Sequence, residues 1–319
     1  MKLRHLLCSL ALFATAATSA LAQNFPTKPV TVLMPYTAGS PIDVIVRVVM
    51  TEAAPRLGQA IVVENKPGAL TRLGIDQMRR APADGYTLAV TTDGLSVTQP
   101  IADPEFKFES GRDYVPVSFL VQFPLLLAAN KDVPAKDVKG LIEYAKAHPG
   151  KVTVAGGPGS ISHIAFERFN RMTGGNMTFI PYKDTNQAFP DMVAGRIDLM
   201  FSGVNMRDAI QANMLKGLAT TGDKRWIAFP NYPTLQESGV EMTTAFWMGI
   251  VAAPGTPKDV VTKLNQAIGA ALQSETVLKR MAEFGMSHGP ATPEQFDAFI
   301  KSELRTWTPI IKAAGIKVR

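Results

Sequence analysis

Short apolar segments alternate with helical patterns along most of this chain, and this alternation limits the fold more than any other feature. The first apolar segment, residues 30–34, ends at a Gly-containing turn, and a helix is expected over residues 40–57, which Gly58 ends. Further strands are expected at residues 61–64 and 87–91. Alternation of this kind predicts an α/β fold, with parallel sheets covered by helices on both faces.

The middle of the chain repeats this order, and two segments stand out from it. Further strands are expected at residues 152–155, 177–181, 197–201 and 218–221, and helices at 160–173, at 185–194, from about residue 205, at 257–273 and at 293–313. Residues 115–129 and 242–253 are instead long, apolar and extended, and a complete α/β unit lies between them. We therefore expect two domains, residues 23–122 with 249–319 and residues 123–248, joined by two crossing strands that leave a cleft.

The first 22 residues have the pattern of an export signal. Lys2 and Arg4 give a positive start, residues 6–17 are almost wholly apolar, and small residues precede a predicted cleavage after Ala22. A membrane anchor is the alternative, but the apolar run is too short to span a bilayer. The sole cysteine, Cys8, lies inside this segment without a lipobox, so the mature chain is expected to have no disulfide, cysteine-based zinc site or catalytic thiol. The expected location is the periplasm.

The charge pattern argues against a nucleic-acid partner. Loss of Lys2 and Arg4 with the signal lowers the formal net charge from +6 to +4. The basic residues are scattered, without a Lys/Arg run interleaved with aromatic residues, so nucleic-acid binding is not expected. A mildly basic exported protein is compatible with an anionic ligand.

Four strand-to-helix corners are candidates for a ligand site. They are residues 36–43, 156–163, 182–186 and 91–96, which are rich in glycine and hydroxyl groups. In open sheets, ligands bind at the carboxyl ends of strands, beside helix N-termini whose free N–H groups suit carboxylates. The first two corners contain no Lys or Arg, so an anion there would be held by amides and hydroxyls. The alternative for each corner is an ordinary turn.

From these corners and their surroundings we predict a set of ligand-binding residues. The predicted set is Tyr36, Gly39, Ser40, Ile42, Asp43, Arg72, Thr92, Asp93, Gly159, Ser160, His163, Asp184, Phe201 and Trp247.

Several of these residues have two possible roles. Ser40 can cap a helix or donate its hydroxyl to a ligand, and Asp43 is expected to accept backbone amides within its own turn. Arg72 can pair with a second carboxylate, which would favour a dicarboxylate, or it can be a solvated loop arginine. Phe201 and Trp247 can form a flat wall for an aromatic dicarboxylate, or they can belong to the core.

No catalytic constellation is found in the sequence. His148 and His288 lie in turn-like contexts, while His163 and Glu167 are four residues apart, which is more typical of a surface pair than of a metal site. There is no G-x-S-x-G motif, and the glycines near residue 159 lack the third glycine of a dinucleotide fingerprint. We therefore expect no enzyme activity, no cofactor and no metal.

Short motifs over nearly the whole mature chain resemble those of the Bug receptors, the extracytoplasmic binding proteins of tripartite tricarboxylate-type transporters. The motifs are Phe25-Pro-Thr-Lys-Pro29, Pro35-Tyr-Thr-Ala-Gly-Ser-Pro-Ile-Asp43, Val63-Glu-Asn-Lys-Pro-Gly68, Ala83-Asp-Gly-Tyr-Thr-Leu88, Pro181-Tyr-Lys183, Gly195-Arg-Ile-Asp-Leu-Met-Phe201, Thr220-Thr-Gly-Asp-Lys-Arg225, Pro233-Thr-Leu-Gln-Glu-Ser-Gly239, Ala253-Pro-Gly-Thr-Pro257 and Thr292-Pro-Glu-Gln-Phe296.

The resemblance implies a two-domain periplasmic-binding-protein (Venus flytrap) fold that closes on a carboxylated solute without chemistry. It implies transporter subunits in the membrane as partners. We expect a di- or tricarboxylate ligand, with an aromatic dicarboxylate such as terephthalate as the option that Phe201 and Trp247 suggest, and a monomeric receptor. The chain departs from the family pattern at Gly39-Ser40, Leu70-Thr71, Asp93 and Ser202, so ligand identity does not carry over. The alternatives to a transport receptor are a sensor subunit for a signalling protein and an exported α/β hydrolase.

Overall fold

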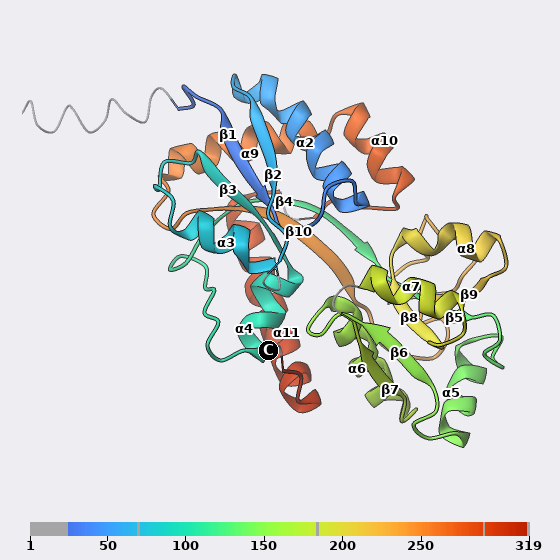
Figure 1. Ribbon diagram of the computed structural model, residues 1–319. Coiled ribbons are helices and arrows are strands. Elements are labelled where there is room, and N and C mark those ends of the chain that lie inside the picture. Colours follow the sequence, from blue (N-terminus) through green and yellow to red (C-terminus); the bar gives the residue numbers. More distant parts are fainter. Residues whose placement is uncertain (1–24, 69–70, 183–184, 290, 318–319) are drawn as a thin grey trace, which may run out of the picture.

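The computed structural model describes residues 25–68, 71–182, 185–289 and 291–317. The chain forms two lobes, each built on a five-stranded sheet (Figure 1). The first sheet contains β1 (Val30–Met34), β2 (Ile61–Asn65), β3 (Thr87–Thr92), β4 (Val115–Pro124) and β10 (Ala245–Ala252), in the order β2-β1-β3-β10-β4. The second contains β5 (Leu126–Asn130), β6 (Thr153–Gly156), β7 (Thr178–Pro181), β8 (Leu199–Ser202) and β9 (Leu215–Thr220), in the order β7-β6-β8-β5-β9. The predicted export signal lies outside the described residues.

The two sheets have the same topology. In the first sheet β1 pairs in parallel with β2 and β3, and β10 lies antiparallel between β3 and β4. In the second sheet β6 pairs in parallel with β7 and β8, and β5 lies antiparallel between β8 and β9. The prediction of parallel sheets was therefore incomplete, because each sheet includes one antiparallel strand.

The antiparallel strands are the ones that enter from the other lobe. β10 begins at Ala245, opposite Pro124 at the end of β4, and β5 begins at Leu126, opposite Ser202 at the end of β8. A parallel strand needs a crossover within its own sheet, whereas a strand that arrives from the neighbouring lobe enters at the edge that faces that lobe. The carboxyl ends of the parallel strands in both sheets therefore lie at the edges where the chain crosses.

Helices cover the sheets largely where the sequence predicts them. They are α2 (Pro41–Leu57), α3 (Arg72–Arg79), α4 (Gln99–Ala102), α5 (Val138–Ala147), α6 (Ile161–Thr173), α7 (Thr185–Val193), α8 (Arg207–Gln211), α9 (Lys258–Leu272), α10 (Glu275–Glu283) and α11 (Pro293–Ala314), with a π-helical turn at Gly94–Thr98 and a 3-10 turn at Val204–Met206. Helices α3, α4, α5 and α10 were not predicted. In the part of the chain that the structure describes, no helix combines the length and apolarity needed to cross a membrane.

Helix α2 shows how local sequence sets the position of the first corner. Ser40 caps its N-terminus, Pro41 occupies its first turn, and Gly58 ends it with a φ of 82°. Residues that have a side chain are strained in this left-handed backbone conformation, whereas glycine adopts it without strain. Ile45 and Val49 on its inner face are fully buried in the core of the lobe, which anchors the helix directly after β1.

Candidate functional site

The corner between β1 and α2 is held together by its own side chains. Gly39 has a φ of 83°, and its amide donates to Oδ2 of Asp43 at 2.9 Å. Oγ of Ser40 accepts from the amide of Asp43 at 3.3 Å and donates to the carbonyl of Thr37 at 3.2 Å. The expectation that Asp43 accepts a backbone amide of its own turn is confirmed, and Ser40 acts as the helix cap.

Asp43 is the centre of a buried network below this corner. Its side chain is almost fully buried and also accepts from Nε of Arg47 at 2.9 Å and from Nδ2 of Asn65 at 2.8 Å. Burial by itself raises the pKa of Asp43, but the hydrogen bonds from Arg47, Gly39 and Asn65 outweigh it and hold the pKa below its usual value. Neither Arg47 nor Asn65 was predicted from the sequence, although the four-residue spacing of Asp43 and Arg47 on a helix was a usable signal.

The corner between β6 and α6 is built in the same way. Gly159 has a φ of 70°, and its amide donates to Nδ1 of His163 at 3.1 Å. Oγ of Ser160 accepts from the amide of His163 at 3.4 Å. The imidazole is buried, stacks on Phe179 with ring centroids 3.8 Å apart, and places Nε2 3.6 Å from Oε1 of Glu167. Since Nδ1 accepts a hydrogen bond, it carries no proton in this arrangement.

The two corners therefore share a Gly-Ser-x-x-acceptor pattern at equivalent places in the two sheets. β1 and β6 are the second strands of their sheets, and each is followed by a left-handed glycine, a serine cap and an acceptor side chain three residues after the serine. Both corners were predicted as candidates from the sequence, but their shared pattern, which the residue spacing alone reveals, was not.

The first turn of each helix keeps backbone N–H groups that have no partner in the described chain. Helix geometry leaves the first N–H groups without an intrahelical acceptor. In α2, Pro41 has no N–H and the serine cap uses that of Asp43, which leaves Ile42. In α6, Ile161 and Ser162 keep theirs. Each corner thus offers amide donors at the positive end of a helix dipole, and neither includes Lys or Arg.

Arg72 is engaged within its own lobe. Its Nη2 lies 2.9 Å from Oδ2 of Asp103, its Nε donates to Oε1 of Gln99 at 2.5 Å, and its guanidinium lies 3.9 Å from the ring centroid of Phe106. The hydrogen bond from Arg72 lowers the pKa of Asp103. Because a carboxylate of the protein already meets this charge, the structure does not support the idea that Arg72 binds a second carboxylate of the ligand.

Thr92 and Asp93 lie buried at the end of β3. Oγ1 of Thr92 accepts a long hydrogen bond, 3.5 Å, from the amide of Leu95. Oδ1 of Asp93 has no partner in the described chain, and burial, followed by the nearby carboxyl of Glu303, raises the pKa of Asp93 well above its usual value. Glu303 is partly buried and accepts from the indole of Trp247 at 3.3 Å.

The two aromatic candidates are core residues. Trp247 is 1% exposed and packs edge-on against Phe296, with ring centroids 5.8 Å apart. Phe201 is also 1% exposed and packs against Phe169. The alternative reading of the sequence, that both belong to the core, agrees with their burial, and they present no wall to a ligand in this structure.

The remaining candidates are partly buried or undescribed. Tyr36 and Ile42 pack against the core of the first lobe, and the carbonyl of Tyr36 accepts from Asn65 at 2.8 Å. Asp184, the candidate in the corner after β7, lies outside the described residues. Among the described residues there is no group of three or more His, Cys, Asp or Glu side chains that could hold a metal ion.

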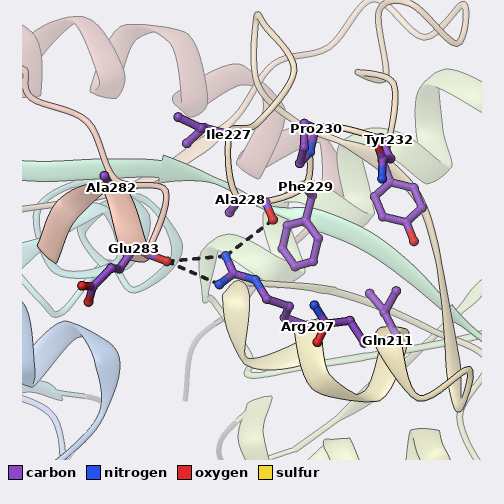
Figure 2. Close-up of a pocket in the computed structure, with 11 residues that line it drawn as sticks. Arg207, Gln211, Ile227, Ala228, Phe229, Pro230, Tyr232, Ala282 and Glu283 are labelled. Atoms are coloured by element: carbon purple, nitrogen blue, oxygen red, sulfur yellow. Dashed lines mark hydrogen bonds between the residues drawn. The ribbon is translucent and has the colours of Figure 1, made fainter. Parts of the chain in front are cut away.

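Two cavities lie away from both corners. One, of about 510 Å³, lies between α8, residues 227–232 and the end of α10 (Figure 2). The other, of about 360 Å³, lies between α4 and the end of α11. Neither is lined by residues of the two corners. Donor chemistry and topology, and not a cavity, therefore mark the two corners as a candidate site, and the first cavity is a separate feature.

Comparison with known proteins finds relatives that match nearly the whole chain. Residues 45–316 match the family model of the tripartite tricarboxylate transporter family receptor, TctC. The chain is 31% identical to the BugT protein of Bordetella pertussis over the full length of both. Among solved structures, it is 30% identical to MatC of Rhodopseudomonas palustris with bound malate, with a TM-score of 0.80 over 90% of this chain and 100% of the other. It is also 30% identical to a second R. palustris protein, solved with adipate, with a TM-score of 0.84 over 92% and 99%.

These relatives confirm the resemblance to Bug receptors and the two-domain periplasmic-binding-protein fold. They are substrate-binding proteins and not enzymes, which sets aside the hydrolase alternative. The chain belongs to the TctC family of tripartite tricarboxylate transporter receptors.

Proposed function

We propose that this receptor captures a small organic carboxylate between its two Gly-Ser corners and presents it to the membrane subunits of a transporter. The observation that carries this proposal is the matched construction of the two corners, at equivalent strand ends that lie where the lobes adjoin. Two helix N-termini with free amides bind an anion through partial charges of about half an elementary charge each.

The internal hydrogen bonds of each corner support this role. Asp43 and His163 each accept a glycine amide, which fixes the backbone of the turn before a ligand arrives. Amides held in place in this way lose little conformational entropy on binding. The proposed contacts are the amides of Ile42 and of Ile161 and Ser162, with Ser40 and Ser160 as the caps that hold the turns.

A dicarboxylate is the proposed class of solute, because the relatives solved with malate and adipate hold dicarboxylates. Arg72 is left out of the proposed contacts, since Asp103 pairs with it. With Phe201 and Trp247 in the core, the two side chains that had favoured an aromatic dicarboxylate no longer do so, and an aliphatic solute is the simpler proposal.

Closure about the crossing strands is part of the proposal. A solute held by amides of both lobes favours the closed arrangement, since only there does it contact both. We propose residues 23–122 with 249–319, and residues 123–248, as the two moving domains. Receptors of this family are periplasmic, and we propose export by a signal cleaved after Ala22 and action as a monomer.

A thermal-shift screen tests the proposal. The purified receptor is heated with acetate, benzoate, malate, adipate and citrate, and with adipamide as an uncharged control for adipate. A ligand at about one hundred times its Kd adds about 2.7 kcal/mol of stability. We expect a clear rise in Tm with at least one dicarboxylate and none with adipamide. No rise with any carboxylate, or an equal rise with adipamide, would contradict the proposal.

A further inference from the structure

The cavity shown in Figure 2 is a groove with walls from both lobes, and we refer to it as the 207–283 groove. The second lobe contributes one face of α8 and the loop over residues 227–232, and the first lobe contributes the last turn of α10. Its lining residues are Arg207, Ile210, Gln211, Ile227, Ala228, Phe229, Pro230, Asn231, Tyr232, Ala282 and Glu283.

Arg207 lies at the centre of this groove, and no carboxylate in the described part of the chain pairs with it. Its guanidinium reaches the carbonyl oxygens of Glu283 and Ala228 only at 3.5 Å, at the long limit of a hydrogen bond. Figure 2 shows the carboxylate of Glu283 turned away from Arg207, and that carboxylate pairs with Arg280 at 2.7 Å. Within the described ranges, no carboxylate oxygen lies within 4.0 Å of Arg207.

Apolar side chains flank this cation. Ile227, at 71% exposure, is more open to solvent than the other exposed large apolar side chains of the described chain, and it stands at the rim. The guanidinium of Arg207 lies over the ring of Phe229, 5.7 Å from its centroid. A half-buried arginine between apolar side chains fits an acidic side chain carried on an apolar segment, because the pair forms where water is partly excluded.

A close contact between the lobes lies beside the groove. The indole of Trp226 donates to the carbonyl of Gly285 at 2.5 Å. Gly285 has a φ of 63°, and a Cβ there would lie 2.3 Å from Nε1 of Trp226, so only glycine allows this approach. Trp226 also stacks on Phe123 of the crossing strand β4. The groove is therefore placed next to the crossing, where rotation of one lobe moves one wall relative to the other.

We propose that the 207–283 groove is the docking surface for an acidic segment of the transporter's membrane subunit. The positive charge of Arg207 and the exposed apolar side chain of Ile227 at the rim favour an acidic segment with apolar neighbours as the occupant. The two-lobe origin of the walls means that a subunit seated here contacts both lobes and so distinguishes their arrangements. This inference rests on the proposed function only for the existence of a transporter partner, and not on which solute the corners bind.

Photo-crosslinking in the bacterium that encodes the receptor tests the proposal. A benzophenone amino acid replaces Ile227, or Asn231 as a second position on the rim, and adducts are identified by mass spectrometry. The test variant adds Arg207→Glu. The matched control adds Arg171→Glu, because Arg171 is an exposed arginine of the same lobe outside the groove.

The expected result is an adduct with the membrane subunit that falls about tenfold with Arg207→Glu, equivalent to about 1.4 kcal/mol of affinity, and is unchanged with Arg171→Glu. Three results would overturn the proposal: the absence of an adduct with that subunit from both positions, an adduct that Arg207→Glu leaves intact, or an adduct only with a second copy of the receptor. The carboxylate screen on purified Arg207→Glu, expected to match wild type, separates failure of docking from failure of solute binding.

Discussion

Replacing Asp43 by asparagine breaks the first corner from below, without changing the size of the side chain. All three partners of Asp43 are donors: the Gly39 amide, Nε of Arg47 and Nδ2 of Asn65. An asparagine keeps one oxygen and turns an NH₂ group toward at least one of these donors. Asn65 cannot simply flip, because its Nδ2 also donates to the carbonyl of Tyr36 and its Oδ1 accepts from Arg47.

The expected cost follows from these contacts. Hydrogen bonds to a charged group contribute about 1.5–3 kcal/mol each, and an unsatisfied buried donor costs about 1–3 kcal/mol. Arg47 is partly exposed, so solvent screens part of its share. We expect Asp43→Asn to lower the free energy of unfolding by about 2–3 kcal/mol. Because the folded pKa of Asp43 is lowered, this stabilisation is present above the unfolded pKa of about 4 and is lost as the pH falls through the folded pKa.

Urea unfolding of both proteins at neutral pH and in acid measures this difference. Glu52→Gln is the matched control, because Glu52 forms a partly exposed pair with Arg56 on the same helix and is expected to cost about 0.5 kcal/mol or less. If Asp43→Asn costs no more than Glu52→Gln, or if its cost is as large in acid as at neutral pH, the account of this corner is wrong.

Three further predictions concern single side chains. Asp93→Asn is expected to stabilise the protein at neutral pH. The folded pKa of Asp93 is raised, so the stability of the wild-type protein falls as the pH rises from about 4 through that pKa, by about 1.4 kcal/mol per unit of raised pKa. Thermal unfolding of both proteins from acid to alkaline pH measures the gain. His163→Leu should weaken adipate binding about tenfold in calorimetry, whereas His163→Asn, whose amide oxygen can accept from Gly159, should bind nearly as wild type; equal losses would refute the acceptor role. Arg72→Ala should lower Tm, through loss of its contact with Asp103, and leave the ratio of dicarboxylate to monocarboxylate affinity unchanged; a selective loss of dicarboxylates would restore a ligand role for Arg72.

Local signals in the sequence were sufficient for the elements that build the corners. The N-cap at Ser40 and the stop at Gly58 both act within a few residues, and α2 has the predicted bounds. Helices α3, α4 and α10 have eight, four and nine residues, too few for periodicity alone to reveal them. The direction of β10 was missed because it depends on which edge of the sheet the chain enters from the other lobe, which no local pattern records.

The same distinction, between contacts that are local in sequence and contacts that are not, applies to the candidate site. Gly39, Asp43, Gly159 and His163 were chosen from corner chemistry, and the structure shows them acting on their own turns. The pairing of Arg72 with Asp103 could not be predicted, because Asp103 lies 31 residues away in sequence, beyond the reach of a local pattern. The identity of a solute was beyond prediction for a related reason, since amides select for negative charge and say little about the rest of a molecule.

Backbone amide NMR during a titration with adipate tests the central claim most directly. If a carboxylate is held between the two Gly-Ser corners, the amide resonances of Ile42, Ile161 and Ser162 should show the largest shifts and follow one saturation curve. Shifts confined to one corner, or centred on the 207–283 groove, would contradict capture of the solute between the lobes.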